Sequence, residues 1–338
     1  MNFRIQRKSN LRLIAVAFLL ALIASFTLTL SQGALGEVKV DPKLPNYKPA
    51  PGLSGQIKSV GSDSMNSLMT QWTEKFKEYY KGVRTEVEGQ GSSKAMPALI
   101  EGAASFGPMS RDIKSNEIAD FEKKYGYKPV LLPTSIDLLA VYVNRDCPLE
   151  SLSMDQVDAI FSSTRKLGGE TIDKWGQLGI TGDYEKEAIA LFGRNSASGT
   201  YGFFKEKALG NGDFRDRVNE QPGSTAVIAS VGENRFAMGY SGIGYRTEAV
   251  KPLALSPKKG EPAIEPSEEN AYNGKYPLGR YLYLAVNYKP TSKLEPLRKE
   301  FLKFVFSKEG QELAVKDGYF PVDAKTAAKA LKMVGIDP

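Results

Sequence analysis

Short apolar runs typical of buried strands alternate along this chain with longer runs in which apolar residues recur at helical spacing. Residues 57–60 and 85–87 are strand-like, whereas residues 65–76 and 95–100 have the helical period. The same alternation returns in the second half, where helices are expected at 154–161, 201–209 and 225–231 and strands near 188–192 and 236–240. Strands that alternate with helices fold into parallel α/β units. The sequence therefore predicts an α/β fold.

Two longer strand-like runs bracket the middle of the chain. Residues 129–144 and 281–287 are rich in β-prone residues and have similar sequences where each run ends. We expect them to be two crossover strands that join two lobes. The first lobe would comprise residues 55–140 plus 285–338, and the second lobe residues 145–280. We also expect a short strand at 104–107, a solvated loop at 256–275 and a C-terminal helix over 294–305 that packs as core on the first lobe.

The N-terminal 36 residues have the organisation of a secretory signal peptide. Four basic residues precede an 18-residue apolar run, and the small residues Ala34 and Gly36 follow it. We expect cleavage before Glu37 and export of the mature chain. A retained anchor is the alternative, because a membrane-spanning helix needs about 20 apolar residues. Residues 37–54 carry four prolines, and we expect them to form an extended linker.

The charge balance does not favour a polyanionic partner. The chain has 45 Lys and Arg against 39 Asp and Glu, but four of the basic residues and none of the acidic ones lie in the leader. The remainder therefore carries 41 minus 39, or +2. Nucleic-acid binding requires a large, clustered excess of basic residues. We expect no nucleic-acid partner, and any bound anion should be small.

The chain has no histidine and one cysteine, Cys147. The lack of histidine excludes His-based zinc sites, Ser-His-Asp triads and Cys-His dyads. A single cysteine cannot form an internal disulfide, and we expect Cys147 to be a small packing residue. The sequence predicts no metal site, no cofactor and no enzymatic activity.

Four loops rich in hydroxyl groups follow predicted strands. They are residues 61–65, 89–94, 107–112 and 194–200. The carboxyl ends of parallel strands meet at one edge of a sheet, so we expect the loops to share a crevice. Three of them lead directly into a helix, whose free N–H groups and partial positive charge favour an oxyanion. Each loop alone is typical of an ordinary turn and N-cap, but the four together predict an oxyanion site.

The charged residues of this site are ambiguous from the sequence. Arg194 or Arg111 could add a bidentate, charge-assisted contact to the anion. Asp63 and Asp137 could each accept a hydrogen bond from a protonated anion. The structural alternatives are a helix N-cap for Asp63 and a solvent-facing strand position for Asp137.

Over about residues 56–322 the chain resembles the periplasmic phosphate-binding proteins of phosphate ABC transporters, in the bacterial extracellular solute-binding superfamily. The resemblance rests on the four loops, on Trp72, and on the closing motifs at 309–311 and 318–321. It implies a two-lobed fold of the type II periplasmic-binding class with a central ligand cleft. It also implies a periplasmic monomer that closes on inorganic phosphate by a hinge motion and delivers it to membrane permease subunits.

The resemblance also implies the positions of the ligand contacts. They are Asp63, Ser64, Ser92, Ser110, Arg194, Ser198, Gly199 and Thr200.

Two positions depart from the pattern of the family. Many relatives carry Ser-Asp where this chain has Ser110-Arg111, and that aspartate is expected to accept the proton of hydrogen phosphate. Asp63, and after it Asp137, are the expected replacements. Ser196 stands where relatives often have an aspartate that pairs with the arginine, which leaves the orientation of Arg194 open.

Three alternatives remain open. The ligand could be another tetrahedral oxyanion such as sulfate, which carries no proton near neutral pH and would not need a carboxylate acceptor. A phosphatase would use Ser64 or Ser198 as its nucleophile, without the histidine that usually activates one. A surface or adhesion protein could use the same fold without transport.

Overall fold

The computed structural model describes residues 38–337, and the compact unit into which they fold begins at Val38. The predicted signal peptide and its cleavage site lie outside the described residues. Among the helices of residues 38–337, none is long and apolar enough to cross a membrane.

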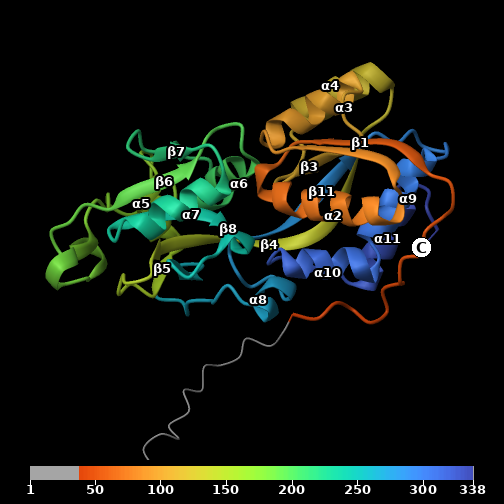
Figure 1. Ribbon diagram of the computed structural model, residues 1–338. Coiled ribbons are helices and arrows are strands. Elements are labelled where there is room, and N and C mark those ends of the chain that lie inside the picture. The colour runs from red at the N-terminus through yellow and green to blue at the C-terminus, as the bar shows by residue number, and fades with distance from the viewer. Residues whose placement is uncertain (1–37, 338) are drawn as a thin grey trace, which may run out of the picture. The chain divides into compact units, whose positions relative to one another are not determined.

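The alternation of strands and helices predicted for the first third of the chain is confirmed (Figure 1). Each of the first two strands leads through a 3-10 turn into a helix, and that helix packs against the next strand. The elements are β1 (Ser54–Val60), η1 (Asp63–Met65), α2 (Asn66–Tyr79), β2 (Gly82–Glu88), η2 (Ser92–Lys94), α3 (Ala95–Glu101), β3 (Gly107–Met109) and α4 (Ser115–Tyr125). Strands β1 and β2 pair in parallel. Helix α4 was not predicted, and β3 begins where the predicted strand at 104–107 ends.

The two long strands are β4 (Val130–Asn144) and β11 (Gly279–Val286), which pair antiparallel. The first part of β4 pairs with β11, and its residues 139–143 pair with β8 (Ala237–Gly242). The largest sheet has the strand order β3-β11-β4-β8-β6-β7. Strand β4 therefore runs through both groups of elements, as expected for a crossover strand.

The second group of elements is built around β8 and β6. Its helices α5, α6 and α7 flank these strands (Figure 1). The elements are β5 (Ser151–Ser153), α5 (Met154–Phe161), η3 (Trp175–Leu178), η4 (Gly182–Tyr184), β6 (Ala190–Arg194), α6 (Gly199–Ala208), β7 (Asn219–Gln221), α7 (Ser224–Glu233), η5 (Ile243–Tyr245), β9 (Val250–Pro252), β10 (Ala254–Ser256) and α8 (Glu268–Tyr272). Helix α8 lies within the segment 256–275 that we expected to be a loop.

The chain then returns to the first group. The last elements are α9 (Pro296–Val305), α10 (Lys308–Lys316), β12 (Phe320–Pro321) and α11 (Ala324–Met333). Helix α9 packs into the core of the first group, as its helical spacing predicted, and the fully buried Trp72 links α2 to α10 by donating to the carbonyl of Gly310 at 2.7 Å.

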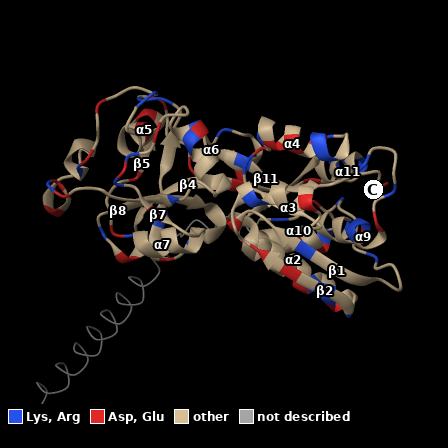
Figure 2. Cartoon of the chain, turned by 90° about the horizontal axis from the view of Figure 1, so that it is seen from above, with Lys and Arg blue, Asp and Glu red and all other residues tan. Residues whose placement is uncertain are grey.

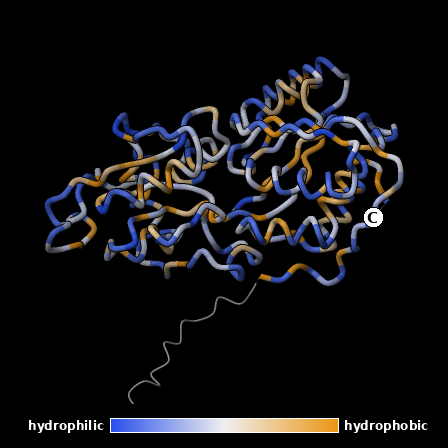
Figure 3. The backbone as a smooth tube through the Cα atoms, in the orientation of Figure 1, coloured by the Kyte–Doolittle hydropathy of each residue, from blue (hydrophilic) through white to orange (hydrophobic). Residues whose placement is uncertain are grey.

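Two large hydrophobic cores divide the molecule. One gathers apolar side chains between residues 44 and 132 and between 282 and 336, and the other gathers those between 138 and 278 together with Phe320. We call the elements around these cores the first and the second lobe. Cys147 packs in the second core, and hydrophobic segments lie inside both lobes (Figure 3). Burial of this apolar surface is the main stabilising contribution to each lobe.

The segment expected to be a linker is extended but packed on the first lobe. Leu44 is 4% and Tyr47 8% exposed, and both belong to the first core. The Tyr47 hydroxyl shares a 2.6 Å hydrogen bond with that of Tyr80, and the carbonyl of Pro45 accepts from the N–H of Lys308 at 2.9 Å. The segment is extended, as predicted, but its apolar side chains contact the core of the first lobe.

Candidate functional site

The four hydroxyl-rich loops converge where the two lobes meet. Ser64, in the loop after β1, shares a 2.7 Å hydrogen bond with Thr200 at the start of α6. The N–H of Ser93, after β2, donates to the carbonyl of Ala197 at 3.2 Å. Ser92 and Ser110 come from the loops after β2 and β3, and their hydroxyls are 3.3 Å apart. The predicted gathering of these loops is thus present, with the second lobe contributing residues 194–200.

The start of α6 presents hydroxyl and N–H donors to the first lobe. The Ser198 hydroxyl caps the helix by accepting from the N–H groups of Thr200 and Tyr201 at 3.1 and 3.4 Å. A Cβ atom on Gly199 would lie only 2.3 Å from Oγ of Ser92 and 2.6 Å from Oγ of Ser110. Glycine is required here because the helix N-terminus approaches the two serines so closely. The hydroxyl groups of Ser92, Ser110 and Ser198 therefore gather at a helix N-terminus, an environment that favours an oxyanion.

Arg194 ends β6 and is almost completely buried. Its Nη1 atom lies 3.1 Å from Oδ2 of Asp63 and donates to the Ser224 hydroxyl at 2.8 Å, while Nη2 donates to the carbonyl of Pro222 at 3.3 Å. Burial lowers the pKa of this guanidinium, and the Asp63 carboxylate opposes the shift. Within residues 38–337 its Nε atom is buried with no hydrogen-bond partner. A buried, unsatisfied donor is costly, and the guanidinium of Arg194 therefore keeps one unused N–H.

Asp63 supplies the carboxylate partner that Arg194 lacks at position 196. The carboxylate reaches across from the first lobe and pairs with Arg194, and its Oδ2 also accepts from the N–H of Ser224 at 2.9 Å. It therefore interacts with the N-terminus of α7 in the other lobe. Negative charge is favourable at that end of a helix. Arg194 has a carboxylate partner even though Ser196 replaces the aspartate expected from the family.

Asp137 is completely buried in β4, so the alternative of a solvent-facing strand position is wrong. Its Oδ2 atom accepts from Nε and Nη2 of Arg280 at 2.9 and 2.7 Å, and its Oδ1 accepts from the N–H of Ile243 at 3.0 Å. Arg280 was not predicted as a site residue. Arg280 immediately precedes the strand-like run at 281–287, and a charged residue at the start of a predicted crossover strand was the one signal that the sequence offered.

The guanidinium of Arg111 is engaged by a carboxylate that lies outside the four loops. Its Nη1 and Nη2 atoms donate to the two carboxylate oxygens of Glu117 at 2.8 and 2.6 Å, and Nη1 also donates to the carbonyl of Asp112. This bidentate pair ties the loop after β3 to the unpredicted helix α4. The geometry gives Arg111 a structural partner, in contrast to the anion contact that we expected for it.

Two tyrosines that were not predicted as site residues hold the turn that contains Asp63 and Ser64. The Tyr245 hydroxyl donates to the carbonyls of Asp63 and Ser64 at 2.9 and 3.2 Å, and the Tyr319 hydroxyl also donates to the carbonyl of Ser64. Burial raises the pKa of both phenols, so they remain neutral donors. Tyr319 belongs to the motif at 318–321, whose contribution here is to fix this turn.

The arrangement suits binding rather than group transfer. The Ser64 hydroxyl bonds to Thr200 and the Ser198 hydroxyl to backbone N–H groups, so in the described part of the chain neither has a side-chain base as hydrogen-bond partner. Across residues 38–337 no three acidic or cysteine side chains are grouped to hold a metal ion. Basic and acidic side chains are interspersed on both lobes (Figure 2), which does not favour a large polyanion.

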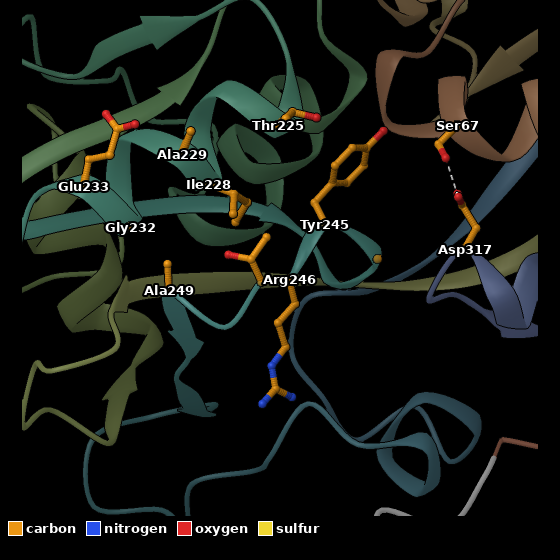
Figure 4. Close-up of a pocket in the computed structure, with 12 residues that line it drawn as sticks. Ser67, Thr225, Ile228, Ala229, Gly232, Glu233, Tyr245, Arg246, Ala249 and Asp317 are labelled. Carbon is orange, nitrogen blue, oxygen red and sulfur yellow. Dashed lines mark hydrogen bonds between the residues drawn. The ribbon is translucent and has the colours of Figure 1, made fainter.

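Tyr245 also lines a cavity of about 610 Å³ (Figure 4). Residues of α7 and of the segment 244–249 line it, together with Ser67 and Asp317 of the first lobe. Burial raises the pKa of Asp317, which accepts hydrogen bonds from Ser67 and Gln71. None of the predicted site residues lines this cavity.

Comparison with known proteins shows the family to which this chain is related. The profile of the PBP superfamily domain matches residues 48–309. The phosphate-binding protein PstS of Pseudomonas aeruginosa is 53% identical over 298 residues, which is 88% of this chain and 92% of that protein. PstS of Staphylococcus epidermidis is 27% identical over 279 residues, 81% of each chain.

Solved structures share the fold at lower sequence identity. A Clostridium perfringens protein, crystallised with bound phosphate and named as a phosphate ABC transporter substrate-binding protein, has a TM-score of 0.67 at 23% identity and covers 80% of this chain and 100% of its own. An ABC-type phosphate transport receptor of Vibrio cholerae has a TM-score of 0.61 at 22% identity and covers 79% and 100%. The two-lobed α/β fold predicted from the sequence is confirmed.

Proposed function

Because the chain belongs to the PBP superfamily, and within it to the PstS phosphate-binding proteins, we propose that it binds inorganic phosphate between its two lobes for uptake by an ABC transporter. The observation that supports this most strongly is the convergence of the four hydroxyl-rich loops at the start of α6, which follows the strand that ends in the buried Arg194. It is a binding component and not an enzyme, since its relatives are named for binding phosphate.

The contact set that we propose is drawn from both sides of the cleft. The first lobe contributes hydroxyl groups from three loops and the second lobe contributes the start of α6 with its arginine. The proposed phosphate contacts are Ser64, Ser92, Ser110, Arg194, Ser198, Gly199 and Thr200. A buried dianion is stable only where nearly all of its oxygen lone pairs meet donors, and these hydroxyl, N–H and guanidinium groups supply them.

Asp63 is the proposed acceptor of the phosphate proton. Oδ2 is used by Arg194 and Ser224, which leaves Oδ1 to face a ligand, and the side chain is 22% exposed, so a ligand can reach it. Both carboxylate oxygens of Asp137 are already engaged, Oδ2 by Arg280 and Oδ1 by the N–H of Ile243. Asp63 therefore takes the part that the aspartate of the family's Ser-Asp pair plays in relatives, and Asp137 is the weaker candidate.

Binding and closure are coupled in this proposal. Contacts such as Ser64 with Thr200 and Asp63 with Arg194 join the lobes directly, so a hinge at the two crossover strands can open and close the site. We place the boundaries of the lobes at residues 55–140 plus 285–338 and at 145–280. The two separate cores support this division, and the packed segment 38–53 belongs with the first lobe.

The setting of this activity is also part of the proposal. A signal peptide over residues 1–36 would direct the chain to the periplasm, where it would act as a monomer and deliver phosphate to permease subunits. Periplasmic placement agrees with the family of binding proteins to which the chain belongs.

A panel of oxyanions in a thermal-shift assay tests the proposal. A ligand that binds only the folded state at a hundred times its Kd stabilises it by about 2.7 kcal/mol, which raises the Tm of a chain of this size by roughly 4 °C. Phosphate should give this shift and sulfate should not. A shift with sulfate alone would identify another oxyanion, and no shift with either would contradict the proposal.

A further inference from the structure

Arg280 and Asp137 occupy directly opposed positions on the two crossover strands. They are register partners in the antiparallel pair of β11 and β4. Both side chains are buried, with 2% and 0% of their surface exposed, and two nitrogens of the guanidinium bond to one carboxylate oxygen. A buried ion pair of this kind is weak evidence for stability, because desolvation offsets much of the attraction. The other contacts of Arg280 indicate what else the pair does.

One guanidinium contacts both lobes from the strands between them. Nη1 of Arg280 donates to the carbonyl of Ser110 in the first lobe at 2.8 Å, and Nη2 donates to Oγ1 of Thr200 in the second lobe at 2.9 Å. Its central carbon also lies 5.2 Å from the centre of the Phe203 ring on α6. Arg280 therefore interacts with the loop after β3 and with the start of α6 at the same time.

The hydrogen bond from Arg280 determines whether the Thr200 hydroxyl can donate to another group. A hydroxyl has one proton and two acceptor lone pairs. Arg280 has only donors, so Thr200 must accept from it and keeps its own proton for another partner. In the structure the Thr200 hydroxyl shares a 2.7 Å hydrogen bond with that of Ser64, in which either oxygen can donate. An oxyanion at this position would have the Thr200 proton available to it, with the positively charged Arg280 bonded to the same hydroxyl oxygen.

We propose that Arg280, oriented by Asp137, is a positioning residue of the phosphate site: it fixes the Thr200 hydroxyl as a donor to the anion and ties the Ser110 loop to the crossover strands. This inference rests on the proposed function, since it assigns a role within the same site. This role gives a reason for a buried Arg280–Asp137 pair on β11 and β4, the two strands at which we propose the hinge.

A double-mutant cycle on phosphate affinity tests this role. Hydrogen bonds to charged groups contribute about 1.5–3 kcal/mol, so Arg280→Gln should weaken phosphate binding by about tenfold to a hundredfold. In the Thr200→Ala background the same substitution should cost less than about threefold, because residues that act as a unit are not additive. Arg280→Lys should recover part of the affinity, since an ammonium group keeps the charge and can reach Asp137 or Thr200.

Arg298→Gln is the matched control. Arg298 is a half-buried arginine of α9 that donates to the carbonyl of Asn287 at 2.9 Å and lies 5.6 Å from the centre of the Phe106 ring, without contact to the converging loops. Its replacement should leave phosphate affinity unchanged. Thermal melts establish that each variant is folded, and if Arg280→Gln does not fold, the cycle is run with Arg280→Lys.

Two results would overturn the inference while leaving the proposed function intact. One is wild-type affinity in a folded Arg280 variant, even if its Tm is lower. The other is an equal loss in the wild-type and Thr200→Ala backgrounds, which would make Arg280 independent of Thr200. Failure of the unmodified protein to bind phosphate would instead contradict the proposed function itself.

Discussion

Replacing Gly199 by alanine adds one methyl group where the start of α6 meets Ser92 and Ser110 of the first lobe. Gly199 is the first residue of α6, and the added Cβ would lie 2.3 Å from Oγ of Ser92 and 2.6 Å from Oγ of Ser110. It would also lie 2.9 Å from Cβ of Ser92, which cannot rotate away. The helix N-terminus and the serine loops must therefore separate for the methyl group to fit.

The size of the effect follows from that overlap. Cβ atoms in real proteins essentially never approach closer than 3.0 Å, so the contact with Ser92 is about 0.7 Å too short. Overpacking of this kind costs about 1–3 kcal/mol. The cost applies to the closed arrangement in which both lobes contact the ligand, so phosphate affinity should fall by about fivefold to 150-fold.

Isothermal titration with phosphate measures this loss, and Gly202→Ala is its control. Gly202 lies in the same helix, but a Cβ there would meet Cδ and Nε of Arg111 at the ordinary contact distances of 3.4 and 3.9 Å. Alanine is favoured over glycine within a helix by about 0.5–1 kcal/mol, so Gly202→Ala should fold at least as stably as the wild type and bind phosphate with the same affinity. If Gly199→Ala binds phosphate as tightly as Gly202→Ala does, the closed site is not the binding site.

Three other changes have definite expected outcomes. Asp63→Asn should reduce the preference for phosphate over sulfate in a competition titration, because the carboxylate that accepts the ligand proton is lost; unchanged selectivity would remove Asp63 from that role. Tyr47→Ala should destabilise the fold by about 3–5 kcal/mol in urea unfolding, since the buried ring packs 5.3 Å from that of Phe304; a negligible change would mean that residues 38–53 do not pack on the first lobe in solution. Burial raises the pKa of Asp317 above its unfolded value, so its charge destabilises the fold as pH rises through that pKa. Asp317→Asn should therefore gain stability relative to the wild type at neutral pH and lose that gain in acid, which thermal melts at both pH values would show.

The spacing of apolar residues was sufficient to predict most of the strands and helices. The strands β1, β2, β4 and β8 and the helices α2, α3 and α5 lie where apolar periodicity placed them, since each buries one face or one continuous run in a core. Helix α4 was missed, and within it Phe121 is the one completely buried side chain. The prolines before Ser54 correctly indicated extended chain, but only the tertiary structure shows that Tyr47 enters the first core.

The candidate site was predictable in its loops and not in its ion pairs. The hydroxyl-rich turns followed strands, and parallel topology brought them together. The partners of Arg194 and Asp137 depend on strand register and on contacts between lobes. The register between β4 and β11 shifts at Leu282/Tyr283, so sequence spacing alone could not align Arg280 with Asp137.

Calorimetric titration of the purified protein with inorganic phosphate at neutral pH tests the central claim most directly. One phosphate should bind per chain with micromolar or tighter affinity, and an excess of sulfate should not displace it. Absence of phosphate binding by the folded protein would contradict the account.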